Sequence, residues 1–135
     1  MDLNGSSKVA YTAAVLDEKS INFLKNNLQI PDYWTVYCHH FTINLGVANN
    51  AIKNMIGSNV ILDVVAIGKN EKVMAVKIET VISSANAIKH ITVAVNKNAG
   101  GKPVYSNQIT NWVPIDPFSL IGKIAECDSQ GNIIN

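Results

Sequence analysis

The chain contains no arginine. Its eleven basic side chains are all lysines, and with ten acidic residues they give a formal net charge of +1. This balance produces no strong long-range field, so a broad, non-specific nucleic-acid surface is not indicated, whereas a small local anion site is compatible with it. Any bound phosphate would have to be held by lysine, hydroxyl groups, backbone amides or histidine, because the bidentate guanidinium fork is missing.

Cysteine is scarce, and long apolar runs are absent. Cys38 and Cys127 allow at most one disulfide, which excludes the disulfide framework typical of small secreted domains. The N-terminal sequence has no apolar segment of the kind found in signal peptides, and no run approaches the roughly 18 residues of a membrane helix. We therefore expect a cytoplasmic protein with no membrane association, and the sequence indicates no obligate protein partner.

The length of 135 residues and the apolar content of 47% are typical of one globular domain with one core. We expect residues 1–7 to be a flexible leader and residues 8–135 to form a single domain. The chain has no room for a second catalytic domain.

Alternating and β-branched residues predict several strands, and one amphipathic pattern predicts a helix. The helix is expected to begin after Asp17, a good N-cap, with Ile21, Leu24 and Leu28 at helical spacing. Glycines and prolines between residues 97 and 117 argue against a long regular element there. This content predicts an α+β fold with mostly antiparallel strands. The expected strands are residues 8–16, 35–45, 59–67, 72–80, 89–96 and 118–127.

Two segments about fifty residues apart repeat a pattern of histidine, apolar residue, threonine and apolar residue. They are residues 40–43 (HFTI) and 90–93 (HITV). Side chains of a strand alternate between its faces, so the histidine and threonine of each segment share one face, opposite the apolar residues. One such segment is well explained by a strand that happens to carry a histidine. Two in compatible strands favour one shared site, provided that the strands are neighbours in a sheet.

The residues His40, Thr42, His90 and Thr92 are suited to acid/base chemistry on a phosphate ester. Imidazole titrates near a pH of about 6.5, so one neutral histidine can accept a proton while its partner, charged beside the phosphate, donates one. The threonines can donate hydrogen bonds to the non-bridging oxygens. This division of roles requires no metal and no cofactor, and the sequence does not decide which histidine is the base.

His39 is expected to point to the face opposite His40 and to be a packed or edge histidine. For the same reason Cys38, His39 and His40 are not expected to bind zinc together, because adjacent strand residues cannot share a face. No other group of cysteines, histidines and carboxylates has the spacing of a metal site.

Three further residues are candidates for substrate binding. Tyr11 can stack on a base, although a half-buried strand tyrosine is the simpler explanation. Ser106, with Lys102 nearby, can contact a phosphate or belong to a solvated loop. Trp112 can line the site or cap the core.

The paired segments HFTI and HITV resemble the signature of the 2H phosphoesterases, also called LigT-like proteins. The strand and helix at the start, the residues IPDYW before the first segment, the run SSANAIKHITVAV and the later GGKPVYSNQITNW are similar to one branch of that superfamily. This branch contains the cyclic phosphodiesterases associated with RNA repair and tRNA ligases. The resemblance extends over roughly residues 8–127.

This resemblance implies a bilobal α+β fold, in which mostly antiparallel sheets surround a central cleft and one or two helices lie on the outside. It implies metal-free hydrolysis of a nucleotide phosphodiester, with catalytic roles for His40, Thr42, His90 and Thr92. Members of the superfamily open 2′,3′-cyclic phosphates, process RNA ends, or degrade cyclic nucleotide signals, including those of bacterial antiphage immunity.

Three functions stay open at this point. The first is a phosphodiesterase acting on a small nucleotide or an RNA end. Its substrate is a 2′,3′-cyclic phosphate or a cyclic oligonucleotide, and the latter suits a phage or viral anti-defence enzyme. The second is a non-catalytic module that binds the nucleotide. The third is a structural domain with accidental segments, which requires His40 and His90 to lie far apart.

Overall fold

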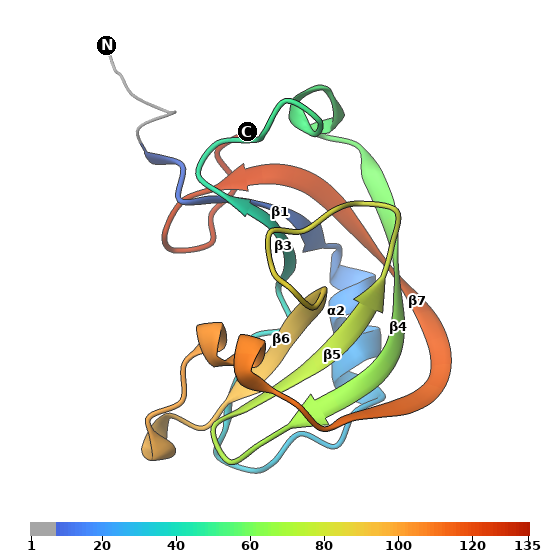
Figure 1. Ribbon diagram of the computed structural model, residues 1–135, viewed down its shortest axis with the longest axis vertical. Coiled ribbons are helices and arrows are strands. Elements are labelled where there is room, and N and C mark those ends of the chain that lie inside the picture. Colours follow the sequence, from blue (N-terminus) through green and yellow to red (C-terminus); the bar gives the residue numbers. More distant parts are fainter. Residues whose placement is uncertain (1–7) are drawn as a thin grey trace.

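The computed structural model describes residues 8–135, and the expected leader at residues 1–7 lies outside them. Antiparallel strands form the framework of these residues, and an α-helix packs against the sheet (Figure 1). The strands are β1 (Tyr11–Leu16), β2 (Thr35–Val36), β3 (His40–Leu45), β4 (Asn59–Lys69), β5 (Val73–Glu79), β6 (His90–Val95) and β7 (Trp112–Cys127), and the helix is α2 (Glu18–Asn26).

Six of the strands form one closed, barrel-like sheet. They follow the order β6-β3-β1-β7-β4-β5, and the additional pairing of β5 with β6 closes the circle. The expectation of an α+β fold with antiparallel strands is confirmed. The expected bilobal arrangement of sheets around a central cleft is wrong, because β5 and β7 tie the two halves of the chain into one continuous hydrogen-bonded sheet.

The core fills the inside of this sheet. Along β4 the residues alternate, so that Val60, Leu62 and Val64 are buried while Ile61 is exposed. The helix closes one side of the core with Leu24, which is fully buried. Asp17 caps the helix as expected, since its carboxylate accepts a hydrogen bond from the Ser20 amide at 2.8 Å.

The segment from residue 35 to 45 is interrupted and is not the single strand that its sequence predicts. Both β2 and β3 pair with β6, but five residue steps separate Val36 from Phe41 whereas only three separate their partners Ala94 and Ile91. The extra residues form a bulge in which Cys38 has a positive φ of 49°. The face on which each side chain lies therefore changes before His40.

Strand β7 begins at Trp112, earlier than the prolines at 114 and 117 suggest. In this first half β7 pairs only with β4, because β1 joins it from Gly122 onward. A proline lacks the amide hydrogen of a ladder bond and is tolerated at such a free edge. The pairs Val64↔Phe118 and Ala66↔Pro114 also show extra residues in β7, so the prolines lie at and beside a bulge.

The connection between β6 and β7 covers the outer face of the sheet with two short 3₁₀ turns, Lys97–Ala99 and Pro103–Gln108. Gly101 permits the close approach, since a Cβ atom there would lie 2.2 Å from the Lys72 carbonyl oxygen. The second turn packs Tyr105 against a small apolar cluster that contains Val73 and Val95. The same turn carries Pro103, Val104 and Asn107, which line the site described below.

Among residues 8–135, no helix has both the length and the apolar character needed to cross a membrane.

The alternation along β4 gives a stability test with a built-in control. Leu62→Ala is expected to lower the free energy of unfolding by about 2–5 kcal/mol, because it leaves a cavity in the core. The neighbouring Ile61→Ala, whose side chain is 63% exposed, should change it by less than about 0.5 kcal/mol. Urea denaturation of both variants measures the difference, and equal losses would contradict the closed-sheet core.

Candidate active site

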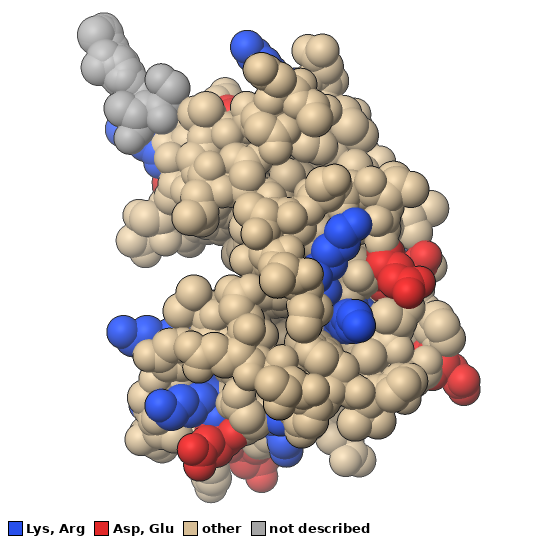
Figure 2. Space-filling view, viewed as in Figure 1, with Lys and Arg blue, Asp and Glu red and all other residues tan. Residues whose placement is uncertain are grey.

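A cavity of about 490 Å³ lies on the outer face of the sheet, beside β1, β3 and β6. The space-filling view shows the molecule hollowed on one side, with mostly uncharged atoms around the hollow (Figure 2). None of the residues that line the cavity is a lysine, aspartate or glutamate. They are Tyr11, Val36, Tyr37, His39, His40, Thr42, Leu45, Asn86, His90, Thr92, Pro103, Val104, Asn107, Ser129, Gln130 and Gly131.

Strands β3 and β6 supply the centre of the cavity. They pair at Phe41↔Ile91, and these two side chains are fully buried in the core. The alternate positions on the same strands, His40, Thr42, His90 and Thr92, therefore face outward, and all four line the cavity. The structure thus brings the two distant segments together, and the arrangement in which His40 and His90 lie far apart does not occur.

His90 is held in one defined orientation. Its Nδ1 atom lies 2.8 Å from the carbonyl oxygen of Ile88. Because a carbonyl only accepts, Nδ1 carries the proton and donates this bond. Nε2 is consequently the nitrogen of His90 that is left to exchange a proton with a ligand. Burial lowers the pKa of His90, and the bond to Ile88 opposes this by raising it.

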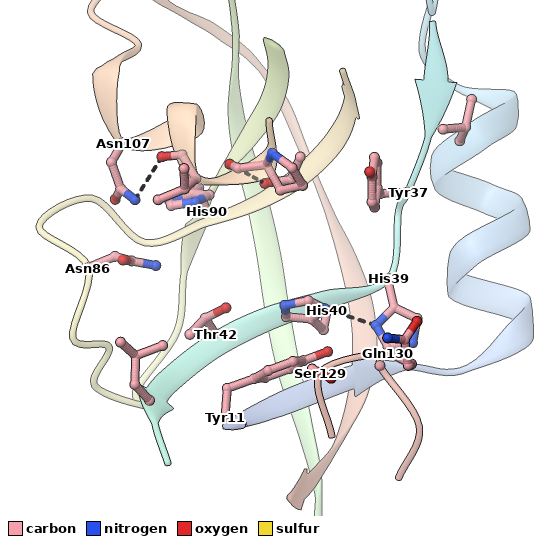
Figure 3. Close-up of a pocket in the computed structure, with 16 residues that line it drawn as sticks. Tyr11, Tyr37, His39, His40, Thr42, Asn86, His90, Asn107, Ser129 and Gln130 are labelled. Atoms are coloured by element: carbon pink, nitrogen blue, oxygen red, sulfur yellow. Dashed lines mark hydrogen bonds between the residues drawn. The ribbon is translucent and has the colours of Figure 1, made fainter. Parts of the chain in front are cut away.

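His40 is stacked on the ring of Tyr11, with 4.6 Å between the ring centroids and an angle of 27° between the planes. Its Nδ1 atom lies 2.9 Å from Nδ1 of His39, as drawn in Figure 3. Burial lowers the pKa of His40 to about 4, with further lowering from the nearby rings of His39 and His90. His40 is therefore neutral at pH 7 in the free protein and available as a proton acceptor.

His39 lines the cavity, so the expectation that it points to the opposite face is wrong. The alternation rule applies within a regular strand, but His39 precedes β3 and follows the bulge at Cys38. The premise that His39 and His40 cannot share a face fails for the same reason. Cys38 itself is fully buried on the core side, where burial raises the pKa of its thiol to about 11.

Ser106 is 1% exposed and does not line the cavity. Its hydroxyl lies 2.8 Å from the hydroxyl of Thr92, which also donates to the carbonyl of Pro103 at 3.3 Å. Ser106 was expected to contact a ligand, but in the structure its hydroxyl contacts Thr92 and holds that side chain in place. Lys102 precedes the 3₁₀ turn and is likewise not among the lining residues.

Trp112 also lies away from the cavity, packed against the small apolar cluster of Val73, Val95 and Ile109. It belongs to the first, β4-paired half of β7 and lies opposite Gly68. Of the three substrate-binding candidates, Tyr11 alone lines the cavity. Burial is the main cause that raises the pKa of its hydroxyl, and the neighbouring Cys127 adds to the effect.

The C-terminal tail forms a wall that the sequence did not reveal. Ser129, Gln130 and Gly131 line the cavity from a turn in which the Asp128 carboxylate accepts hydrogen bonds from the amides of Gln130 and Asn132, both at 2.9 Å. The sequence signal available for this turn was the Asp-x-x-Gly pattern. This pattern predicts a turn, but it does not predict which part of the molecule the turn packs against.

Two asparagines complete the polar lining, Asn86 before β6 and Asn107 in the 3₁₀ turn after it. Asparagine is common in loops, so nothing in the sequence distinguished these two from the many others. Their amide groups can both donate and accept hydrogen bonds.

In the part of the chain that the structure describes, no three side chains among histidine, cysteine, aspartate and glutamate lie close enough together to hold a metal ion. Cys38 and Cys127 are both buried and free.

Two histidines and two threonines facing one cavity from paired antiparallel strands define a 2H phosphoesterase-type domain. The comparison with protein families gives the same answer, because residues 8–124 match the family described as the fungal tRNA ligase phosphodiesterase domain. The chain belongs to this family, which supports a cyclic phosphodiesterase function. No curated protein and no solved structure matches the chain.

The buried histidines should titrate unusually. On lowering the pH from 7, we expect the ring signals of His40 to stay those of the neutral form until about pH 4, and those of His39 and His90 to change below their ordinary pKa. The physical cause is that burial disfavours the charged form. An NMR titration of histidine ring protons measures this. Titration of His40 at or above a pH of about 6.5 would contradict the burial of its ring.

Proposed function

We propose that the protein is a 2H-type phosphodiesterase that hydrolyses a nucleotide phosphodiester by two-histidine acid/base catalysis. The observation that carries the proposal is the convergence of His40 and His90 on one cavity, each with Nδ1 engaged elsewhere. This arrangement leaves Nε2 of each ring for the substrate, which is the requirement for an acid and a base acting on the same phosphorus atom.

His40 is assigned as the base and His90 as the acid. His40 has the lower tendency to hold a second proton, since burial and the rings of His39 and His90 all oppose a positive charge on it. In His90 the carbonyl of Ile88 stabilises the imidazolium form through the Nδ1 bond. The negative charge of a bound phosphate favours protonation of one ring, and His90 is the better placed of the two.

The reaction is a single in-line displacement. Nε2 of His40 takes a proton from a water molecule whose oxygen forms the new bond to phosphorus. Nε2 of His90 gives a proton to the ribose oxygen as its bond to phosphorus breaks. Thr42 donates a hydrogen bond to a non-bridging oxygen, where negative charge increases in the transition state. Thr92 donates to the other when its hydroxyl turns from the Pro103 carbonyl to the substrate. The product of a 2′,3′-cyclic phosphate is a phosphate monoester and a free ribose hydroxyl.

The lining of the cavity favours a substrate with little charge. Around the histidines lie uncharged donors such as Asn86 and Asn107, and apolar side chains such as Val36 and Val104. A 2′,3′-cyclic phosphate carries one negative charge and a base that the apolar part can contact, so a small nucleotide or an RNA end is the first expected substrate. Cyclic oligonucleotides also contain phosphodiester bonds to ribose oxygens, and they carry more phosphates. They are the second substrate class to test.

Product analysis tests the proposal. The full chain is incubated in EDTA with 2′,3′-cyclic mononucleotides, an RNA ending in a 2′,3′-cyclic phosphate, and cyclic di- and trinucleotides. We expect turnover of at least one, and a loss of roughly 10² to 10⁴ in rate in His40→Ala and in His90→Ala, because each removes a positioned proton-transfer group.

The control is Ile61→Ala, on the exposed face of β4 and outside the cavity lining, which should keep full activity. Full activity of either histidine variant, or turnover only after a metal ion is added, would overturn the two-histidine mechanism. Tight binding of a nucleotide without any product would show instead a module that sequesters it.

A further inference from the structure

We propose that His39 is a positioning residue that accepts the Nδ1 proton of His40 and so presents the lone pair of Nε2 to the substrate. This inference rests on the proposed function, and it extends the catalytic pair of histidines to three. The carrying observation is the distance of 2.9 Å between the two Nδ1 atoms, which is a hydrogen bond between the rings.

The Nδ1 atoms of His40 and His90 have different hydrogen-bond partners. At His90 the acceptor of the Nδ1 proton is a backbone carbonyl, that of Ile88, two residues earlier. Two residues before His40 stands Cys38, whose positive φ of 49° belongs to the bulge between β2 and β3. At His40 the partner of Nδ1 is the side chain of His39. Because of the bulge, the hydrogen-bond acceptor at His40 is an imidazole nitrogen, whereas at His90 it is a backbone carbonyl.

His39 is itself held in place by the C-terminal turn. A Cβ atom on Gly131 would lie 3.4 Å from Cε1 of His39 and 3.6 Å from the Tyr11 hydroxyl, so the turn packs directly on this ring. The ring planes of His39 and His40 are almost perpendicular, at 83°. Figure 3 shows His39 to the right of His40 and close to Gln130 of the same turn. The C-terminal turn therefore limits the movement of the His39 ring.

Only one proton can lie between two Nδ1 atoms when both rings are neutral. If His40 carries it, Nε2 of His40 is a free base, as the proposed mechanism requires. The transfer then leaves His40 as an imidazolium whose Nδ1 proton is still accepted by His39, so the hydrogen bond between the rings is kept throughout the step. If His39 carried it, Nε2 of His40 would be protonated and could not accept a proton from water.

Several titratable groups surround this pair and share its electrostatic environment. His90 faces His40 across the cavity and lowers its pKa. Tyr11 stacks on His40 from β1, and its hydroxyl interacts with Cys127 and Asp128. The pKa of Asp128 is lowered by its hydrogen bonds to the turn, so this carboxylate is ionised throughout the relevant range.

Nitrogen-15 NMR of the histidine rings tests the inference without any substrate. At pH 7 we expect His40 to be protonated on Nδ1 and His39 on Nε2. A His40 ring protonated on Nε2 would overturn the proposal. This result does not depend on turnover, so if no substrate is hydrolysed but the expected tautomers are seen, the proposed function fails and the positioning contact stands.

Two variants at the same position provide the activity readout. In His39→Asn the amide oxygen occupies the place of Nδ1 and still accepts a hydrogen bond, whereas His39→Leu keeps similar bulk without an acceptor. We expect a loss of kcat on the order of 10- to 100-fold in His39→Leu, the range known for partners that orient metal-binding histidine rings. KM should change little, and His39→Asn should restore most of the activity.

The pH profile separates positioning from packing. Asparagine does not titrate, so His39→Asn removes the ring that lowers the pKa of His40. The pKa of His40 should rise from about 4, and the acid limb of kcat/KM should move to higher pH. Equal activity of the asparagine and leucine variants, with an unmoved acid limb, would show that His39 serves only to pack the site.

Discussion

The site depends on the packing behind it. Phe41 and Ile91 lie opposite each other on β3 and β6 and are fully buried in the core. Burial of two such side chains fixes the register of the strands, since a slip of one residue would turn every apolar side chain of one strand outward. The same register fixes the outward direction of His40, Thr42, His90 and Thr92. The two histidines therefore lie on the outer face of the same strands whose inner face forms the hydrophobic core.

Burial also sets the chemistry of the histidines. A closed sheet on one side, a 3₁₀ turn and the C-terminal turn on the other remove much of the water from the rings, and the pKa of each is lowered. The free site is thus uncharged, and the first strong charge to enter it is that of the substrate. In the proposed function, this is how a chain without arginine would bind a phosphodiester. Fixed neutral donors would meet the anion, together with a histidine that becomes charged when the anion binds.

The sequence predicted most of the elements and the centre of the site, because both follow from local periodicity. The alternation in HFTI and HITV correctly gave the outward face, and Asp17 gave the start of the helix. The features that the sequence could not predict depend on contacts between distant residues. Closure of the sheet requires the β5–β6 pairing, the role of Gly131 requires the tail to fold back, and the place of His39 depends on a bulge at Cys38. Periodicity carries no sign of such an interruption.

In the proposed reaction, His40 and His90 act on one phosphorus atom. The most direct measurement follows the ring signals of both histidines while a nucleoside 2′-phosphate or its 3′ isomer, the product of opening a 2′,3′-cyclic phosphate, is added. We expect both rings to respond along the same saturation curve and the pKa of His90 to rise as the anion binds. Binding of the nucleotide that leaves either ring unchanged would contradict it.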